Sequence, residues 1–327
     1  MNQTTASRPL VIVTRRLPAA TEKRLGELFN VRLNPDDHPF SPEELVSALQ
    51  EADILLATLP DRLTADLIAK AGPQLRMIAN FGAGTDHIDL KACAERKIIV
   101  TNTPGVLTDD TADITLMLIL MALRRAGEGE RHARTGLWQG WAPTFMLGHC
   151  LKGKTLGIVG MGRIGQAVAR RAAPFGLKTL YHNRKPVDPA LEAELATTYC
   201  QDIEAMLAQT DILTLTCPYT HETHHLISAE RMEKLKPTAF LVNTARGPVI
   251  DETALETMLK AGTLAGAGLD VYEREPAISP GLLALENVVL LPHLGTATEE
   301  TRTAMDERVI INIQSVLNHH TPPNRIT

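Results

Sequence analysis

The feature that most constrains the fold of this chain is a glycine-rich turn between an apolar strand and a helix. The apolar run Thr155–Val159 comes first. Gly160, Gly162 and Gly165 then form the pattern G-x-G-x-x-G, and the helical sequence Gln166–Ala172 follows. In such a turn the glycines permit a tight bend, a close approach of the backbone to a pyrophosphate, and close helix–strand packing. The helix N-terminus adds N–H donors. The turn therefore predicts a dinucleotide site, the alternative being a tight turn without ligand.

Short β-branched runs alternate with helical stretches along the chain, as in parallel sheets covered by helices. The runs fall into two series. The strands expected in the first are Leu10–Thr14, Val31–Leu33 (the weakest), Ile54–Ala57, Arg76–Asn80 and Ile98–Thr101. Those expected in the second are Thr155–Val159, Lys178–Tyr181, Ile212–Thr216, Phe240–Asn243, Ala267–Val271 and Val288–Leu291. The pattern predicts an α/β protein with two parallel-sheet domains of Rossmann-like or flavodoxin-like type.

Capping residues mark several helices. Ser41–Glu44 combines an N-cap, a proline and acidic residues at a helix start. Helices at Ile164–Phe175 and Glu252–Ala261 each end at a glycine. An amphipathic helix at Glu299–Leu317 could cover either sheet. The apolar run Ile114–Leu123 is shorter than the roughly 20 residues of a membrane span, so we expect a helix buried between domains or subunits.

Composition excludes several functional classes. The formal net charge of the 327 residues is -5, and the absence of a long basic tract gives nucleic-acid binding no electrostatic support. The four cysteines show no C-x-x-C spacing, which argues against a zinc site and fits a reducing compartment. The polar segment Met1–Pro9 precedes an apolar run too short for a signal peptide. We therefore expect a cytoplasmic protein without membrane or nucleic-acid partners.

The residues after the next strand predict the cofactor. In NAD enzymes an acid roughly 20 residues beyond the turn binds the ribose hydroxyls. This chain instead has Asn183, Arg184 and Lys185 and no acid there. An amide and two cations suit the 2′-phosphate of NADP. NADP(H) is therefore favoured over NAD(H), the alternative being a solvated basic turn.

Polar residues end three of the later strands, where open α/β sheets bind ligands. Arg246 could bind a carboxylate and polarise a keto oxygen, and His293 could protonate that oxygen as hydride arrives. Glu275, hydrogen-bonded to His293, would favour the imidazolium form. Taken singly, these residues could be a surface ion pair, a loop histidine and a simple turn. Together they predict hydride transfer to a small 2-oxo acid. Other histidines are expected to be solvated, namely His221, His224, His225, His319 and His320.

At this point the chain resembles a known family, the D-isomer-specific 2-hydroxyacid dehydrogenases, over essentially its whole length. Besides the glycine-rich turn, the resemblance rests on four motifs, Phe81–Asp89, Val242–Gly247, Gly268–Tyr272 and Leu291–Thr298. The glyoxylate/hydroxypyruvate reductases are the most similar subgroup. The resemblance implies Arg246 as substrate binder, Glu275 as partner carboxylate and His293 as general acid/base, and a 2-oxo or 2-hydroxy acid as the small-molecule partner.

The resemblance also implies a substrate domain. Backbone amides of Ala83 and Gly84 would cradle the substrate carboxylate, and Leu59, Phe81 and Trp141 are plausible pocket walls. The substrate domain would be discontinuous, with residues 1–101 and 295–327 flanking a dinucleotide-binding domain of residues 102–294 and the active site in the cleft between the two.

Similar reductases are dimers held by an arm, which implies a homodimer here with a dimerisation arm near residues 124–150. Trp141 would then close the neighbouring subunit's active site, or only fill the interface. The residues expected to contact the dinucleotide are Thr111, Gly160, Gly162, Arg163, Ile164, Gly165, Asn183, Arg184, Lys185, Cys217, Pro218, Thr223, Thr244, Ala245, Arg246, Asp270, His293 and Gly295. No metal site is expected.

One departure bears on the cofactor: many relatives carry an acid where this chain has Asn183 and Arg184. Two other functions stay open. A phosphite dehydrogenase would share the fold and a similar Trp-x-Pro arm. A non-enzymatic dinucleotide sensor would keep the same three polar residues, but such relatives tend to carry terminal extensions, and this chain ends soon after its last helix.

Overall fold

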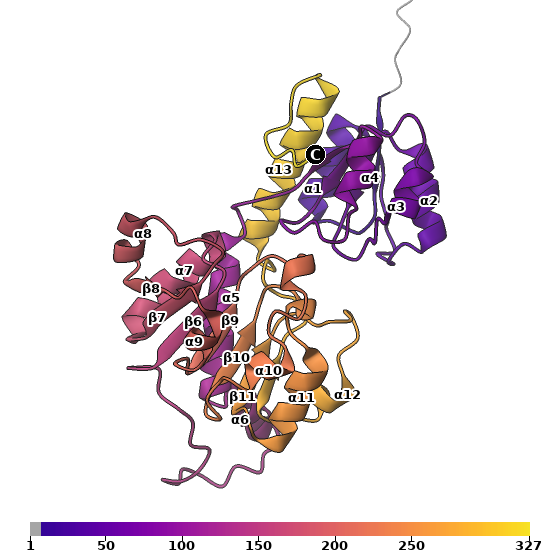
Figure 1. Cartoon of the computed structure of the whole chain (residues 1–327). Helices are drawn as coiled ribbons and strands as arrows, with labels where there is room; N and C mark the ends of the chain where they lie inside the picture. Colours follow the sequence, from indigo (N-terminus) through magenta and orange to yellow (C-terminus); the bar gives the residue numbers. More distant parts are fainter. Residues whose placement is uncertain (1–7) are drawn as a thin grey trace, which may run out of the picture. The chain divides into compact units, whose positions relative to one another are not determined.

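The computed structural model describes residues 8–327, which form two compact units (Figure 1). Unit 1 runs to Leu107 and resumes at Ala297–Thr327, and unit 2 is Thr108–Thr296. The boundaries fall at Leu107 and Ala297, where we predicted 101 and 295. Residues 1–7 of the polar segment used to argue against a signal peptide lie outside the described residues.

Unit 1 contains a five-stranded, all-parallel sheet with the order β2-β1-β3-β4-β5. Its strands are β1 (Leu10–Val13), β2 (Asn30–Arg32), β3 (Ile54–Ala57), β4 (Met77–Asn80) and β5 (Ile99–Thr101). Its helices are α1 (Ala19–Leu28), α2 (Pro42–Glu51), α3 (Ala65–Ala69), α4 (Leu90–Glu95) and α13 (Glu299–Leu317). The predicted cap at Ser41 forms a full capping box with Glu44.

The C-terminal helix belongs to unit 1. Met305, Val309 and Ile313 of α13 are buried together with side chains of β1 and β4. The helix packs on β4 and beside α1 (Figure 1). A second cluster that includes Leu55 and Ile78 fills the opposite face of the sheet. The central strands are therefore buried on both faces, as their continuous apolar runs require.

Unit 2 contains a seven-stranded parallel sheet with the order β12-β11-β10-β9-β6-β7-β8. Its strands are β6 (Thr155–Val159), β7 (Lys178–His182), β8 (Thr197–Tyr199), β9 (Ile212–Leu215), β10 (Phe240–Asn243), β11 (Gly266–Leu269) and β12 (Val288–Leu290). Its α-helices are α5 (Thr108–Leu123), α6 (Ala126–Arg134), α7 (Arg163–Ala172), α8 (Pro189–Glu194), α9 (Ile203–Leu207), α10 (Ala229–Met232), α11 (Glu252–Ala261) and α12 (Pro280–Leu283). Single 3₁₀ turns are η1 (Ala173–Phe175), η2 (His221–Thr223) and η3 (Gly247–Val249). The edge strand β8 is the one strand that we did not predict among residues 8–327.

Helix α5 corrects one prediction. Its apolar run, Ile114–Leu123, was expected to lie between domains or subunits. Instead α5 packs against α7 and strands β10–β12 of its own unit, and Leu118 and Ile119 are fully buried there. The helix is apolar on several sides because a sheet covers one side and a helix another.

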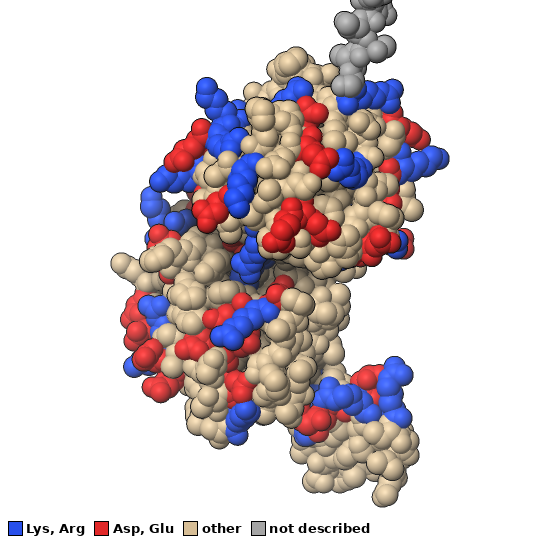
Figure 2. Space-filling model, turned by 90° about the vertical axis from the view of Figure 1, so that its right-hand side faces the viewer, with Lys and Arg blue, Asp and Glu red and all other residues tan. Residues whose placement is uncertain are grey.

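The described surface carries both signs of charge. On the face shown in Figure 2, acidic and basic side chains are interspersed. Among residues 8–327, none of the helices has the length and apolar character needed to cross a membrane. The same residues contain no cluster of three or more side chains suited to a metal ion, and all four cysteines are free.

Candidate active site

The glycine-rich turn joins β6 to α7 as predicted. Gly160 has a φ of +101°, and a Cβ there would lie 2.6 Å from the Cys217 amide nitrogen. A Cβ on Gly165 would overlap the Gly160 carbonyl oxygen, whereas a Cβ on Gly162 would meet nothing within 4 Å. Gly162 is also the N-cap of the ten-residue helix α7. Open space before the free N–H groups of a helix N-terminus suits a pyrophosphate, so these residues fit a dinucleotide.

The loop after β9 borders this turn. Cys217 is buried, and burial raises the pKa of its thiol to about 11, which keeps it neutral. The Thr223 hydroxyl donates to the Pro218 carbonyl at 2.8 Å and so shapes the loop. At the start of α7, Arg163 is exposed and Ile164 is half-buried.

The basic turn follows β7. The Tyr199 hydroxyl donates to the Asn183 carbonyl at 3.1 Å. Arg184 and Lys185 are exposed, and the charge of Arg184 acts on the carboxylate of Glu222. Two exposed cations therefore stand where a phosphate at the adenosine end of a dinucleotide would bind.

An acid that sequence reasoning missed lies near this turn. A hydrogen bond from the Thr220 hydroxyl is the main cause that lowers the pKa of Glu222, and the charges of His221 and Arg184 lower it further. Glu222 comes from the loop after β9, not from the end of β7. The expectation of an acid roughly 20 residues beyond the glycine-rich turn applies only to the end of β7, so it could not reveal Glu222.

His293 and Glu275 meet as predicted. His293 Nδ1 lies 2.8 Å from Glu275 Oε2, and the Tyr272 N–H donates to Glu275 Oε1 at 3.0 Å. Burial alone would raise the pKa of Glu275, but the hydrogen bond and charge of His293, the Tyr272 amide and the charge of Arg246 together hold that pKa below its usual value. Glu275 is therefore an ionised partner for the His293 ring.

Asp270 fixes the backbone around His293. Its carboxylate is 1% exposed and accepts the N–H groups of Leu294 at 2.6 Å and Gly295 at 2.9 Å. The His293 N–H donates to the Asp270 carbonyl at 3.0 Å. Burial is the main cause that raises the pKa of this carboxyl. These bonds hold His293 at a φ of +56°, a conformation that L-residues rarely adopt.

Arg246 sits in a turn that Asn243 organises. The Asn243 side chain accepts the Ala245 N–H at 3.0 Å and donates to the Arg246 carbonyl at 2.9 Å. Thr244 is held by a hydroxyl contact of 2.8 Å to Thr115. Sequence reasoning assigned no role to Asn243 or Thr115, although an asparagine at the end of a buried strand is a signal for such a turn.

Elsewhere in unit 2, the Thr111 hydroxyl donates to the Gly295 carbonyl at 3.2 Å. This bond links the start of α5 to the loop after His293. Both residues were predicted to contact the dinucleotide, and the bond places them together.

In unit 1, the backbone carbonyls of the loop after β4 accept hydrogen bonds from two asparagine side chains. The Asn80 amide donates to the carbonyls of Gly82 and Gly84 at 3.1 and 2.8 Å, and the Asn102 amide donates to that of Ala83 at 2.8 Å. Within the described part of the chain, no hydrogen bond engages the amides of Ala83 and Gly84. A loop with bound carbonyls and unused N–H groups suits an anion.

Two predicted pocket walls also lie in unit 1. Leu59, just after β3, is half-buried. Phe81 is 7% exposed, and the Arg302 guanidinium lies 5.7 Å from its ring centre.

The predicted arm of unit 2 exposes apolar side chains. Trp141 is 84% exposed. The other exposed apolar residues of the arm are Leu137, Trp138, Phe145 and Leu147. The loop between α6 and β6 that carries them runs outside the body of unit 2 (Figure 1).

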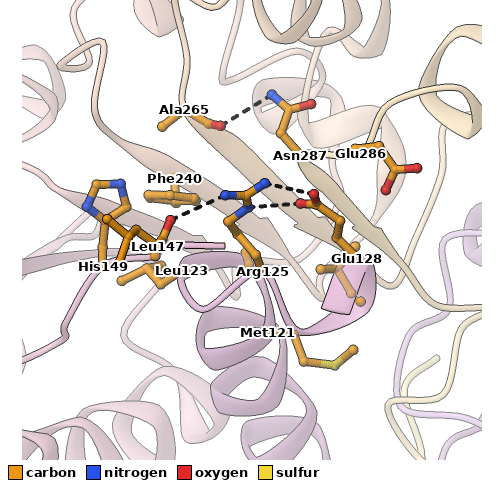
Figure 3. A pocket seen from close by; sticks show the side chains of 14 residues that line it. Met121, Leu123, Arg125, Glu128, Leu147, His149, Phe240, Ala265, Glu286 and Asn287 are labelled. Atoms are coloured by element: carbon orange, nitrogen blue, oxygen red, sulfur yellow. Dashed lines mark hydrogen bonds and ion pairs between the residues drawn. The ribbon is translucent and has the colours of Figure 1, made fainter. Parts of the chain in front are cut away.

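A hollow of about 280 Å³ lies at the base of this arm (Figure 3). Phe240, Ala265 and Asn287 line it at the amino ends of strands β10–β12. Arg125 crosses it with two hydrogen bonds to Glu128, at 2.7 and 2.8 Å. The carboxyl ends of these strands carry the predicted site residues, so this hollow is separate from them.

The histidines expected to be solvated require one correction. His221, His224, His319 and His320 are exposed, but His225 is half-buried. Its Nε2 lies 2.8 Å from Glu273 Oε1. The partner is 48 positions away, so local polarity could not reveal it.

Comparison with known proteins identifies the class. The family model for the NAD-binding domain of D-isomer specific 2-hydroxyacid dehydrogenases matches residues 116–295. The chain belongs to this family, and is therefore an oxidoreductase with a nicotinamide dinucleotide cofactor.

Individual relatives match almost the whole chain. Glyoxylate reductase of Korarchaeum cryptofilum is 44% identical over 98% of this chain and 96% of its own length, and that of Thermococcus litoralis is 42% identical over 98% and 97%. Among solved structures, an NADPH-dependent glyoxylate/hydroxypyruvate reductase of Sinorhizobium meliloti in complex with NADP and malonate is similar. It has 34% identity and a TM-score of 0.88, and the match covers 98% of this chain and 97% of that one.

Proposed function

We propose that this protein reduces a small 2-oxo acid, glyoxylate or hydroxypyruvate, to glycolate or D-glycerate with NADPH. The observation that carries the proposal is the His293–Glu275 pair, which stands at the carboxyl edge of the sheet that also bears the dinucleotide turn. The names of the relatives support the substrate class, since several are glyoxylate reductases.

The chemistry divides among the chain's own residues. When bound, the reduced nicotinamide supplies the hydride. His293 donates a proton to the keto oxygen, and Glu275, kept ionised by its lowered pKa, stabilises the imidazolium before that transfer. Arg246 binds the substrate carboxylate and polarises the carbonyl. We also assign the unused amides of Ala83 and Gly84 to the carboxylate.

The preference for NADPH over NADH rests on Arg184 and Lys185. Both side chains are exposed at the end of β7, where the ribose of a dinucleotide lies in this fold. Two cations there attract a 2′-phosphate, and Asn183 adds a hydrogen-bonding amide.

The homodimer is also a proposal. Five apolar side chains of the arm are 43% to 84% exposed, and apolar groups gathered on one segment mark contact surfaces. We propose that a second copy of this chain covers them.

The test is a rate comparison of the purified protein with glyoxylate, hydroxypyruvate and larger 2-oxo acids, each with NADPH and NADH. The expected result is turnover of the two small acids with higher kcat/KM for NADPH. Tight dinucleotide binding without any turnover would indicate a sensor instead. Oxidation of phosphite with NAD would indicate a phosphite dehydrogenase.

A further inference from the structure

A second histidine–carboxylate pair stands beside the proposed active site. His225 Nε2 lies 2.8 Å from Glu273 Oε1, and the two side chains are 33% and 26% exposed. Glu273 lies two residues before Glu275 in the same loop. The proposed chemistry does not use this pair. Its location next to the loop of Glu275 therefore points to a different role.

The backbone of His225 is bound to the segment that follows Arg246. The His225 N–H donates to the Pro248 carbonyl at 2.8 Å, and the Ile227 N–H donates to the Val249 carbonyl at 3.0 Å. Residue 248 lies in η3, which begins directly after Arg246. His225 therefore touches the Arg246 segment through its backbone and the Glu275 loop through its ring.

Those two segments also contact each other closely. A Cβ on Gly247 would overlap the carbonyl of Tyr272 and lie against the amide nitrogen of Glu273. The Glu273 N–H donates to Glu252 Oε2 at 2.9 Å, at the start of α11. The Tyr272 N–H binds Glu275 directly, at 3.0 Å. A displacement of Glu273 would thus move the peptide that holds Glu275.

The third contact of His225 is with an earlier part of its own loop, the one that follows β9. Its ring stacks on that of His224, with centres 4.1 Å apart. His224 Nδ1 lies 3.3 Å from the Tyr219 hydroxyl, next to Pro218, which we expect to contact the dinucleotide. Three segments with expected roles in binding and catalysis therefore meet at one residue, two of them at its ring and one at its backbone.

We propose that His225 is a positioning residue, which through its hydrogen bond to Glu273 fixes the loop of Glu275 relative to Arg246 and the dinucleotide-binding loop. The proposal rests on the proposed function, because the groups it positions are those of 2-oxo acid reduction. His225 itself contacts no reacting atom in this scheme.

The test compares three variants. His225→Phe keeps a ring that can stack on His224 but loses the donor to Glu273. His225→Gln replaces Nε2 with an amide donor at similar reach. His221→Phe is the matched control, an exposed histidine in the same loop.

For His225→Phe we expect kcat with glyoxylate and NADPH to fall about tenfold. The variant loses one oriented hydrogen bond, whose free energy corresponds to a rate change of about that size. The dissociation constant for NADPH should stay within about twofold, as the glycine-rich turn is untouched. His225→Gln should recover most of the rate. A generally unfolded variant would lose both properties and would not be rescued by Gln.

Hydrogen exchange gives a readout that does not depend on turnover. In His225→Phe, amides of residues 246–251 and 272–276 should exchange faster, whereas those of β6 and α7 should not change. Unchanged exchange in those segments, an unchanged kcat, or no rescue by Gln would each overturn the positioning role. If the wild-type protein reduces no 2-oxo acid, the proposed function fails, while hydrogen exchange still decides whether His225 holds the segments.

Discussion

His293 Nδ1 lies 2.8 Å from Glu275 Oε2, while the other oxygen of that carboxylate accepts the Tyr272 N–H. Because both oxygens are engaged, the carboxylate has one orientation, and so has the imidazole that it binds. The second ring nitrogen, Nε2, is thereby left to carry the exchangeable proton.

The first prediction concerns this pair. His293→Asn should lower kcat by roughly 10²- to 10⁴-fold, the contribution of a general acid, with the NADPH dissociation constant within about twofold. Asparagine is the suitable replacement because it tolerates the positive φ of this position. Glu275→Gln keeps a polar group of the same size, so its loss should be smaller, about tenfold. Steady-state kinetics and fluorescence titration measure both; a rate above half of wild type for His293→Asn would remove His293 from the mechanism.

The second prediction concerns cofactor choice. Arg184→Ala should raise the dissociation constant for NADPH about tenfold or more, because a charged hydrogen bond to the 2′-phosphate is lost, and should change that for NADH by less than about twofold. Lys178→Ala is the matched control, since Lys178 is an exposed cation at the opposite end of the same strand. Equal weakening of both cofactors would show Arg184 to be only a surface charge.

The third prediction concerns the arm. The double variant Trp138→Ser, Trp141→Ser should shift the protein from dimer toward monomer in light scattering after size exclusion. Large aromatic side chains that become buried on association contribute much of the binding free energy of such interfaces. Leu283→Ser removes another apolar side chain, 61% exposed on α12, and should leave the mass unchanged. A wild-type protein of monomer mass would disprove the dimer.

The fourth prediction concerns Asp306 of α13. The carboxyl is 4% exposed, accepts a hydrogen bond from the Thr21 hydroxyl, and its Oδ1 has no hydrogen-bond partner in the described structure. Burial is the main cause that raises the pKa of Asp306 from its ordinary value of 3.8 to about 6.

The folded chain therefore binds this proton more tightly than the unfolded chain. The stabilisation is present below about pH 4 and is lost as pH rises through 6. Relative to Asp306→Asn, the wild type should lose on the order of 1–3 kcal/mol of unfolding free energy between pH 4 and 7. Urea unfolding across this range measures the difference. The neighbouring exposed carboxylate variant Glu307→Gln serves as control, and a pH-independent difference for Asp306→Asn would refute the assignment.

Much of the fold follows from local pattern. Strands β3, β6 and β10 and helices α11 and α13 have the predicted bounds, because apolar runs, caps and terminal glycines act within a few residues. The edge strand β8 was not predicted, since its three residues are too few to show a period. Helix α5 was assigned to the wrong environment because its apolar character does not identify what covers it.

The candidate site divides in the same way. Arg246, Glu275 and His293 could be named because the carboxyl ends of parallel strands meet at one edge of a sheet. Asn243 could also have been named, because it bonds residues only two and three positions further on. The pairing of His225 with Glu273 could not, because the two residues lie 48 positions apart. Glu222 near Arg184 likewise comes from a different strand end than the rule inspects.

The interrupted course of unit 1 has a consequence for how the chain folds during synthesis. Met305, Val309 and Ile313 complete one of its two hydrophobic clusters, yet the ribosome translates them only after the whole of Thr108–Thr296. All strands of unit 2 are therefore synthesised before α13. Until α13 is made, one face of the β1–β5 sheet lacks the helix that covers it in the folded unit. That interval is when unit 1 is most exposed to aggregation and to chaperones.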